Sequence, residues 1–201
     1  MRPSLFQRIA WFLCWISIAS GGVGCTRTPS AAPSNTRIDA RELLVEAQVF
    51  PAHWIAAPCG PDCQRTEQRY TAERVFGNPM VSGRSVQEVF VFGSGEEAHA
   101  KYLTYYKNSF RPRVAPHTQL VTPATFHYQS ALANESSFGC GVDIVPLCVA
   151  LLRYDVHVIA FTFTMGEADQ AGGLRLENIE PILQVIDGKV AAARGNVTPR
   201  P

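Results

Sequence analysis

The sequence predicts an α+β domain in which a mainly antiparallel sheet is covered by helices. Three observations lead to this class. Two segments, near residues 95–110 and 176–194, have apolar residues at helical spacing; several short segments are rich in β-branched and aromatic residues; and Gly- or Pro-containing turns separate these segments. Residues 38–195 are enough for one domain with its own core, and no internal repeat is present.

The first 24 residues have the features of an export signal. Arg2 and Arg8 make the N-terminal region basic, the apolar stretch 9–19 follows it, and small residues lead to Cys25. The apolar stretch is well short of the ~20 residues that a membrane-spanning helix needs. We therefore expect residues 1–24 to be removed.

The residues before Cys25, "GVGC", resemble a bacterial lipobox, with Gly22 in the place of the usual aliphatic residue. The resemblance implies that Cys25 is lipidated and becomes the N-terminus; the alternative is an ordinary signal cut near Gly24. Residues 26–37 are rich in Pro, Ser, Thr and Ala and are expected to be a flexible tether. The predicted location is the outer side of the bacterial cell membrane, reached through the lipid anchor.

The next segments alternate between helix and strand. Asp39 is a candidate N-cap for a short helix that carries Leu43, Leu44 and Ala47 and stops before Pro51. Residues 68–77 and 85–93 have strand composition and are expected to pair as antiparallel strands.

An amphipathic helix is predicted after Ser94, with Ala98, Tyr102 and Tyr105 on one side. Three extended segments follow, at residues 126–131, 148–154 and 156–165. In the last of them, large side chains at alternate positions indicate one face that meets the core. The final helix, residues 176–194, has a stripe of apolar residues and carries Pro181 near its start, and residues 196–201 are a tail.

Four parts of the sequence occur in a characteristic order: "LLVEAQVFPAHW", "VFVFGSGEEAHAKY", the "ANES" turn, and the closing hairpin followed by "LENIEPILQVID". This order resembles the extracytoplasmic sensor-type domains of actinobacterial Ser/Thr kinases and similar surface lipoproteins. It implies the fold of residues 40–190 and assigns no ligand-binding or catalytic residue.

Four cysteines remain in the exported domain. Cys59 and Cys63 flank a Gly-Pro-Asp turn, a spacing that resembles the Sco-type copper chaperones, and soft thiolates suit Cu(I). Because an oxidising compartment favours disulfides, we expect two of them and no bound metal. Four cysteines allow three connectivities, of which the local pairs Cys59–Cys63 and Cys140–Cys148 need the least rearrangement.

Catalytic and cofactor sites find little support. Cys140 with His127 or His157, oriented by Asp143, matches no peptidase pattern, and the histidines are scattered without metal-ligand spacing. The "GSGEEA" stretch has the glycines of a dinucleotide fingerprint, but its glutamates would repel phosphate, and Ser94 with Glu97 instead forms a capping box. We expect no cofactor and no catalytic residue.

A binding surface is the remaining candidate for function. Cations and aromatic residues alternate along one segment, and the candidate residues are Lys101, Tyr105, Lys107, Arg111 and Arg113. The mature chain is nearly neutral, which argues against a nucleic-acid partner. The predicted function is a non-enzymatic binding or sensing module of the envelope with an unknown ligand or partner protein. The alternatives are a copper chaperone that uses Cys59 and Cys63, or an envelope hydrolase.

Overall fold

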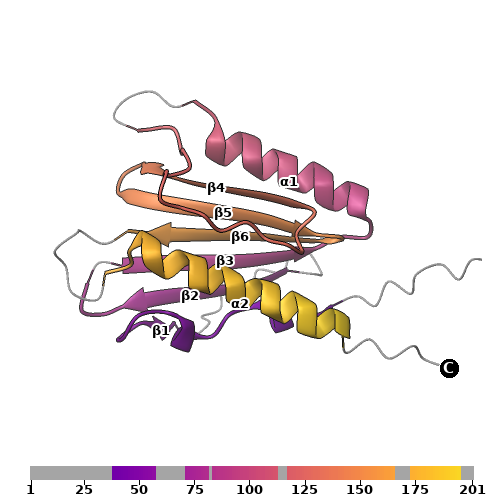
Figure 1. The fold of residues 1–201 in the computed structure, drawn as a ribbon, viewed down its shortest axis with the longest axis horizontal. Helices are drawn as coiled ribbons and strands as arrows, with labels where there is room; N and C mark the ends of the chain where they lie inside the picture. Colours follow the sequence, from indigo (N-terminus) through magenta and orange to yellow (C-terminus); the bar gives the residue numbers. More distant parts are fainter. Residues whose placement is uncertain (1–37, 58–70, 82, 113–116, 166–172, 196–201) are drawn as a thin grey trace, which may run out of the picture. The chain divides into compact units, whose positions relative to one another are not determined.

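The structure is a computed structural model that describes residues 38–57, 71–81, 83–112, 117–165 and 173–195. The predicted α+β class is confirmed, because one six-stranded antiparallel sheet carries a helix on each face (Figure 1). The elements in chain order are two 3-10 helices, η1 (Ala40–Leu43) and η2 (Ala47–Val49), then β1 (Ile55–Ala56), β2 (Thr71–Asn78), β3 (Gly83–Val91), α1 (Gly95–Phe110), β4 (Glu135–Val142), β5 (Pro146–Tyr154), β6 (His157–Thr164) and α2 (Leu176–Gly195).

The sheet consists of two locally connected halves that are joined by one pairing. The strand order is β1-β2-β3-β6-β5-β4, and every pair is antiparallel. The first half is β1-β2-β3 and the second is β4-β5-β6. They meet only where β3 pairs with β6, from Ser85 opposite Phe163 to Val91 opposite His157, and we call this pairing the seam.

Each face of the sheet packs against a core of its own. Ile159, Phe161 and Phe163 of β6 point into the larger core, which α2 and the N-terminal segment close. The intervening Val158 and Ala160 point into a smaller core beneath α1. The predicted alternation of large and small side chains is therefore confirmed, and the small side receives a helix as well.

The N-terminal segment differs from the single short helix that the sequence predicts. Asp39 caps η1, its Oδ1 accepting from the Arg41 backbone N–H at 2.9 Å, but the chain then extends before η2. The buried side chain of Gln87 explains the interruption. Its Nε2 donates to the Leu43 carbonyl at 2.9 Å, and its Oε1 accepts from the Val45 N–H at 2.8 Å, so a tertiary contact replaces the helical hydrogen bonds.

The predicted β2–β3 pair and the helix after it are confirmed. Ser94 caps α1 by accepting from the Glu97 N–H at 3.1 Å, and the Glu97 carboxylate accepts in return from the Gly93 N–H at 2.9 Å. This is the predicted capping box, with the return bond one residue earlier than usual. Ala98 and Tyr102 are buried beneath the helix.

The final helix is also confirmed, and its predicted apolar stripe forms much of the larger core. Pro181 is its sixth residue, so the carbonyl of Glu177 lacks the helical N–H that a different residue would supply. The buried stripe consists of Ile179, Ile182, Leu183, Ile186 and Val190.

The strand predicted at residues 126–131 is wrong, and β4 is the strand that the sequence analysis missed. Residues 126–131 belong to an irregular segment, here called the edge loop (residues 117–134), which follows the outer side of β4 and then crosses toward α2. The backbone N–H groups of His127 and Tyr128 both donate to Glu180 Oε1, at 2.6 and 3.2 Å. A side chain of α2 therefore satisfies groups that a strand would have paired.

No helix in the described part of the chain is long and apolar enough to cross a membrane. The predicted signal (1–24), Cys25 with its tether (26–37) and the tail (196–201) lie outside the described residues.

Candidate functional site

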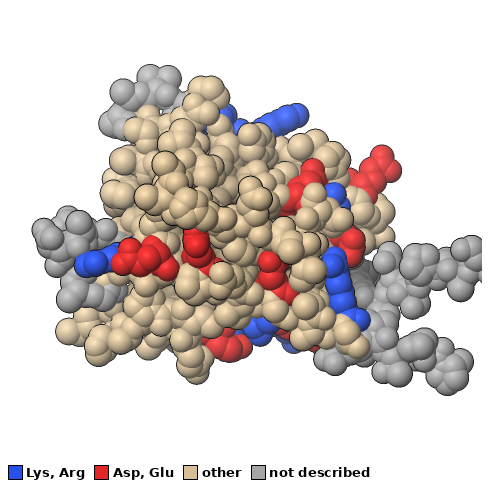
Figure 2. Space-filling view, in the orientation of Figure 1, with Lys and Arg blue, Asp and Glu red and all other residues tan. Residues whose placement is uncertain are grey.

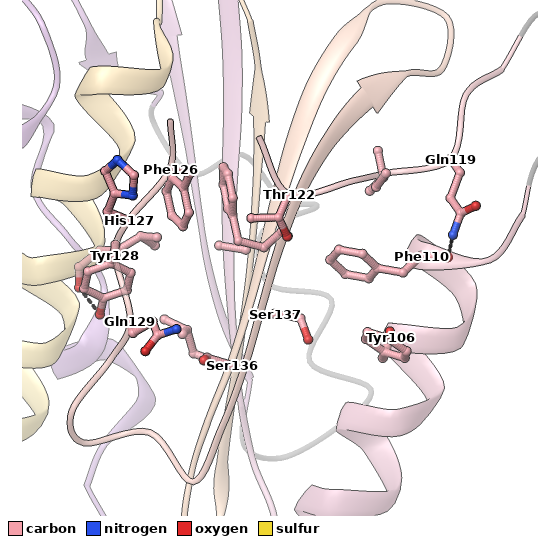
Figure 3. A pocket seen from close by; sticks show the side chains of 15 residues that line it. Tyr106, Phe110, Gln119, Thr122, Phe126, His127, Tyr128, Gln129, Ser136 and Ser137 are labelled. Atoms are coloured by element: carbon pink, nitrogen blue, oxygen red, sulfur yellow. Dashed lines mark hydrogen bonds between the residues drawn. The ribbon is translucent and has the colours of Figure 1, made fainter. Parts of the chain in front are cut away.

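A cavity of about 490 Å3 lies along the outer edge of β4, and we call it the edge cavity (Figure 3). It is bounded by the C-terminal half of α1, the edge loop, β4, β5 and one residue of α2. Its lining residues are Tyr106, Phe110, Gln119, Leu120, Thr122, Phe126, His127, Tyr128, Gln129, Ser136, Ser137, Phe138, Ala150, Leu152 and Leu183. None of them is Asp, Glu, Lys or Arg.

Every second residue of β4 directs its backbone N–H and C=O groups toward this edge. Cys140 exchanges two hydrogen bonds with Val121 of the edge loop, at 2.9 and 3.0 Å, so the even-numbered residues of β4 direct their N–H and C=O groups away from β5. Toward the hairpin end, Thr118 bonds to Val142 through its backbone and its hydroxyl. The edge loop therefore occupies this part of the edge.

After Val121, the edge loop makes one more contact with β4 and then leaves it. The Thr122 hydroxyl donates to the Phe138 carbonyl at 2.7 Å, and this is the last bond between the loop and the edge. Among the described residues, no group bonds to the Phe138 N–H or to the N–H and C=O of Ser136. Three backbone groups of an edge strand thus remain unpaired beside the edge cavity.

Two glycines of β4 allow the neighbouring chain to lie this close. A Cβ at Gly139 would come within 2.9 Å of the Phe110 ring and 3.1 Å of the Leu120 backbone. A Cβ at Gly141 would come within 2.8 Å of Thr118 Oγ1. Glycine in a strand commonly marks such an approach of another backbone.

The edge cavity reaches both faces of the sheet. On the α2 side, Phe126 stacks on Phe138 with ring centroids 3.7 Å apart, and Leu152 and Leu183 belong to the adjoining core. On the α1 side, Tyr106 stacks on Phe110 with ring centroids 5.1 Å apart. Ser137 points to the same side, where its hydroxyl lies 2.7 Å from that of Tyr102.

A carboxylate on α2 holds the edge loop in place. Asp187 Oδ1 accepts from the hydroxyls of Ser130 and Tyr154, at 2.6 and 2.7 Å, and Oδ2 accepts from the Tyr128 hydroxyl at 2.7 Å. Ser130 Oγ in turn accepts from the Ala133 N–H at 2.9 Å. Burial and then the Asp187 carboxylate raise the pKa of both tyrosines, so the phenols remain protonated donors. We call these four side chains the Asp187 cluster.

A second polar cluster joins α1 to the start of β4. The Glu135 carboxylate lies 2.8 Å from His99 Nδ1 and accepts from Arg153 Nε. Burial alone would raise the pKa of Glu135, but the hydrogen bonds and charges of His99 and Arg153 outweigh it and lower this pKa. The strand therefore begins at a fixed position beneath α1.

The cysteine predictions can be compared with the structure in part. Cys140 and Cys148 are directly opposite on β4 and β5 and form a disulfide, which confirms the local pairing predicted for them. Cys140 is therefore not a free thiol for catalysis. Cys25, Cys59 and Cys63 lie outside the described residues, so their lipidation and pairing stay predictions.

The histidines named as catalytic candidates are dispersed. His157 is buried in β6, with its ring nitrogens 3.3 Å from the Tyr154 carbonyl oxygen and 3.0 Å from that of Ile38. His127 is exposed at the edge cavity, and Asp143 pairs with His117 at 2.8 Å. Within the described ranges, no three His, Cys, Asp or Glu side chains are placed to hold a metal ion.

The predicted cationic surface is divided in the structure. The Lys101 ammonium lies over the rings of Phe90 and Tyr105, at 5.1 and 4.8 Å from their centroids, and so covers the smaller core. Burial and the nearby Glu88 raise the pKa of Tyr105. Lys107 is exposed, and because it follows Lys101 by six residues, the two side chains lie about 120° apart around the helix axis.

Arg111 caps the end of α1 and is exposed, whereas Arg113 lies outside the described residues. The edge cavity shares no residue with the predicted surface. On the face seen in Figure 2, acidic side chains follow α2, and the area above α2, over β4 and the edge loop, is almost free of charge.

Two signals in the sequence could have indicated the edge cavity. No Asp, Glu, Lys or Arg occurs from Val114 to Asn134, the longest uncharged stretch of the exported domain. The two glycines of "FGCGV" then mark the approach of another backbone to an extended segment.

Comparison with known proteins finds no family model, no curated protein and no solved structure that matches this chain.

Proposed function

We propose that this chain is a lipid-anchored, outward-facing binding module of the bacterial envelope, and that it holds an uncharged ligand in the edge cavity. The observation that carries the proposal is the composition of the cavity wall. Aromatic rings, hydroxyls and amides line about 490 Å3, and none of the lining side chains is Asp, Glu, Lys or Arg. Such a mixture of apolar surface and a few polar groups is typical of ligand sites.

The anchor part of the proposal is supported by the sequence. The export signal and the cysteine at position 25 are followed by a tether without apolar periodicity. A binding domain on such a tether would sample ligands close to the membrane surface. The alternative functions, copper transfer by Cys59 and Cys63 or hydrolysis, gain no further support from the described residues.

The test uses the full-length protein, extracted in mild detergent, and a panel of uncharged aromatic and amide-containing compounds. A compound present at 100 times its dissociation constant stabilises the folded state by about 2.7 kcal/mol. For a domain of this size, the midpoint of thermal unfolding should rise by roughly 5 to 10 °C.

The matched variants are Ser136→Trp, which adds a large side chain at an exposed residue of the cavity wall, and Gln48→Trp, which adds the same side chain at an exposed position of η2. Stabilisation should disappear in Ser136→Trp and persist in Gln48→Trp. Equal stabilisation of both variants would place the ligand elsewhere. Stoichiometric copper in the purified protein that is lost in Cys59→Ser would favour the copper chaperone instead.

A further inference from the structure

The unpaired edge of β4 indicates what kind of ligand fits the edge cavity. Ser136 offers an N–H and a C=O, and Phe138 offers an N–H, all directed away from β5 and without partners among the described residues. Building on the function proposed above, we infer that the ligand is an extended peptide from another molecule, which adds alongside β4 as a short further strand. Such addition satisfies edge groups through main-chain hydrogen bonds.

The hydrogen-bond pattern limits how the peptide is held. In an antiparallel arrangement, one peptide residue exchanges two bonds with Ser136, and the residue two positions before it accepts from the Phe138 N–H. The Phe138 carbonyl is already occupied by Thr122. The peptide therefore needs two carbonyls but only one of its own N–H groups.

The shape of the cavity specifies the side chains. Phe138 belongs to the larger core, so peptide side chains opposite Ser136 and Phe138 point to the α2 side, toward Leu152 and Leu183. The residue between them points to the α1 side, toward the stacked rings of Tyr106 and Phe110, both of which line the cavity. We expect apolar peptide residues opposite Ser136 and Phe138 and an uncharged residue between these two, because no lining Asp, Glu, Lys or Arg would neutralise a charge.

The first experiment selects a peptide and then maps its backbone contacts. The full-length protein is screened against acetylated and amidated hexapeptides built from uncharged residues, and the best binder is resynthesised with a single N-methyl group at each position in turn. N-methylation should weaken binding by about tenfold at the residue opposite Ser136, where the N–H that bonds to Ser136 is lost, and by less than threefold at the residues on either side of it, whose N–H groups point away from β4. Equal tolerance at every position would overturn strand addition.

Amide hydrogen exchange supplies a readout that needs no variant. In the free protein, the Ser136 and Phe138 amides should exchange fast, while that of Ser137, which pairs with Leu151 inside the sheet, should be protected. Peptide should slow exchange at Ser136 and Phe138 and leave Ser137 unchanged. Fast exchange at Ser136 in the complex would contradict the inference.

The matched variants are Ser136→Pro and Ser136→Ala. Proline removes the outward N–H and is tolerated on an edge strand, whereas alanine removes only the hydroxyl. Ser136→Pro should weaken peptide binding by about tenfold and Ser136→Ala by less than twofold. If Ser136→Pro does not fold, as judged by its circular dichroism, the N-methyl scan and hydrogen exchange still decide the question.

The remaining outcomes separate this inference from the proposed function. If small uncharged compounds bind in a manner that Ser136→Trp abolishes, but no peptide binds, the cavity is a ligand site and the peptide inference is wrong. If neither binds, both proposals fail. A dimer seen by sedimentation and lost in Ser136→Pro would assign the edge to a second copy of the chain.

Discussion

Removing the carboxylate of the Asp187 cluster should destabilise the domain and open the edge cavity. Asp187 accepts three hydroxyl donors, from Tyr128, Ser130 and Tyr154, at 2.6 to 2.7 Å. A hydrogen bond to a charged group contributes about 1.5 to 3 kcal/mol. The three bonds are not additive, because the edge loop can move into water once it is released. We expect Asp187→Ala to lower the free energy of unfolding by about 3 to 5 kcal/mol.

Single deletions should rank by burial. Tyr154 is only 1% exposed, and Tyr154→Phe should lower the free energy of unfolding by about 2 kcal/mol. Tyr128 is half-buried, and Tyr128→Phe should lower it by about 1 kcal/mol. Asp187→Asn should lose less than Asp187→Ala. The amide can donate to the Tyr128 oxygen while the Tyr128 hydroxyl turns to the Leu183 carbonyl, 3.2 Å away.

The assay is urea unfolding followed by circular dichroism, with a double-mutant cycle between Asp187→Ala and Tyr154→Phe. A coupling energy of about 1 kcal/mol or more is expected for groups in direct contact. Asp187→Ala should also weaken the binding of any ligand to the edge cavity, since Tyr128 and Phe126 form one of the cavity walls. A loss below 1 kcal/mol, or strictly additive effects in the cycle, would refute the claim that Asp187 holds the edge loop.

Burial raises the pKa of Tyr102, Tyr105, Tyr128 and Tyr154 above the unfolded value near 10. Their contribution to stability is therefore present well below pH 10 and is lost as the pH rises through 10, by up to about 1.4 kcal/mol per pH unit for Tyr154, which is 1% exposed. Urea titrations at pH 9 to 11 would measure this loss. Gly141→Ala should destabilise the domain by about 1 to 3 kcal/mol in thermal unfolding, because its Cβ would lie 2.8 Å from Thr118 Oγ1, and an unchanged midpoint would show that the loop yields freely. Cys25→Ser should move the protein from the membrane fraction to the soluble fraction, and unchanged partitioning would end the lipid-anchor hypothesis.

Local patterns predicted the elements whose stability is local. The α1 capping box needs only Ser94 and Glu97, and the apolar stripe of α2 follows from helical spacing alone. The N-terminal segment could not be predicted in this way, because the groups that interrupt its helix belong to Gln87, more than 40 residues away. A polar residue inside a strand pattern does not reveal which backbone it will bond.

The edge of the sheet was predicted least well. The stretch 126–131 has the aromatic residues of a strand, but its backbone bonds to Glu180 of α2. β4 itself carries Ser136, Ser137 and two glycines, so its sequence lacks the bulk that marks a strand. The edge cavity combines residues from five elements and segments, and only their tertiary arrangement brings Tyr106 and Leu183 to one site.

The seam between β3 and β6 has a consequence for how the chain folds. The hairpins β2–β3 and β5–β6 close short loops, but the seam joins residues that are 66 positions apart at Val91 and His157 and 78 positions apart at Ser85 and Phe163. Closing that long connection loses the most chain entropy before any contact is gained. The two halves of the sheet should therefore form early and dock late, and substitutions at the seam should slow refolding more than equally destabilising substitutions on α2. Until docking, β3 and β6 each present an unpaired edge, which is the stage at which this chain is most exposed to aggregation.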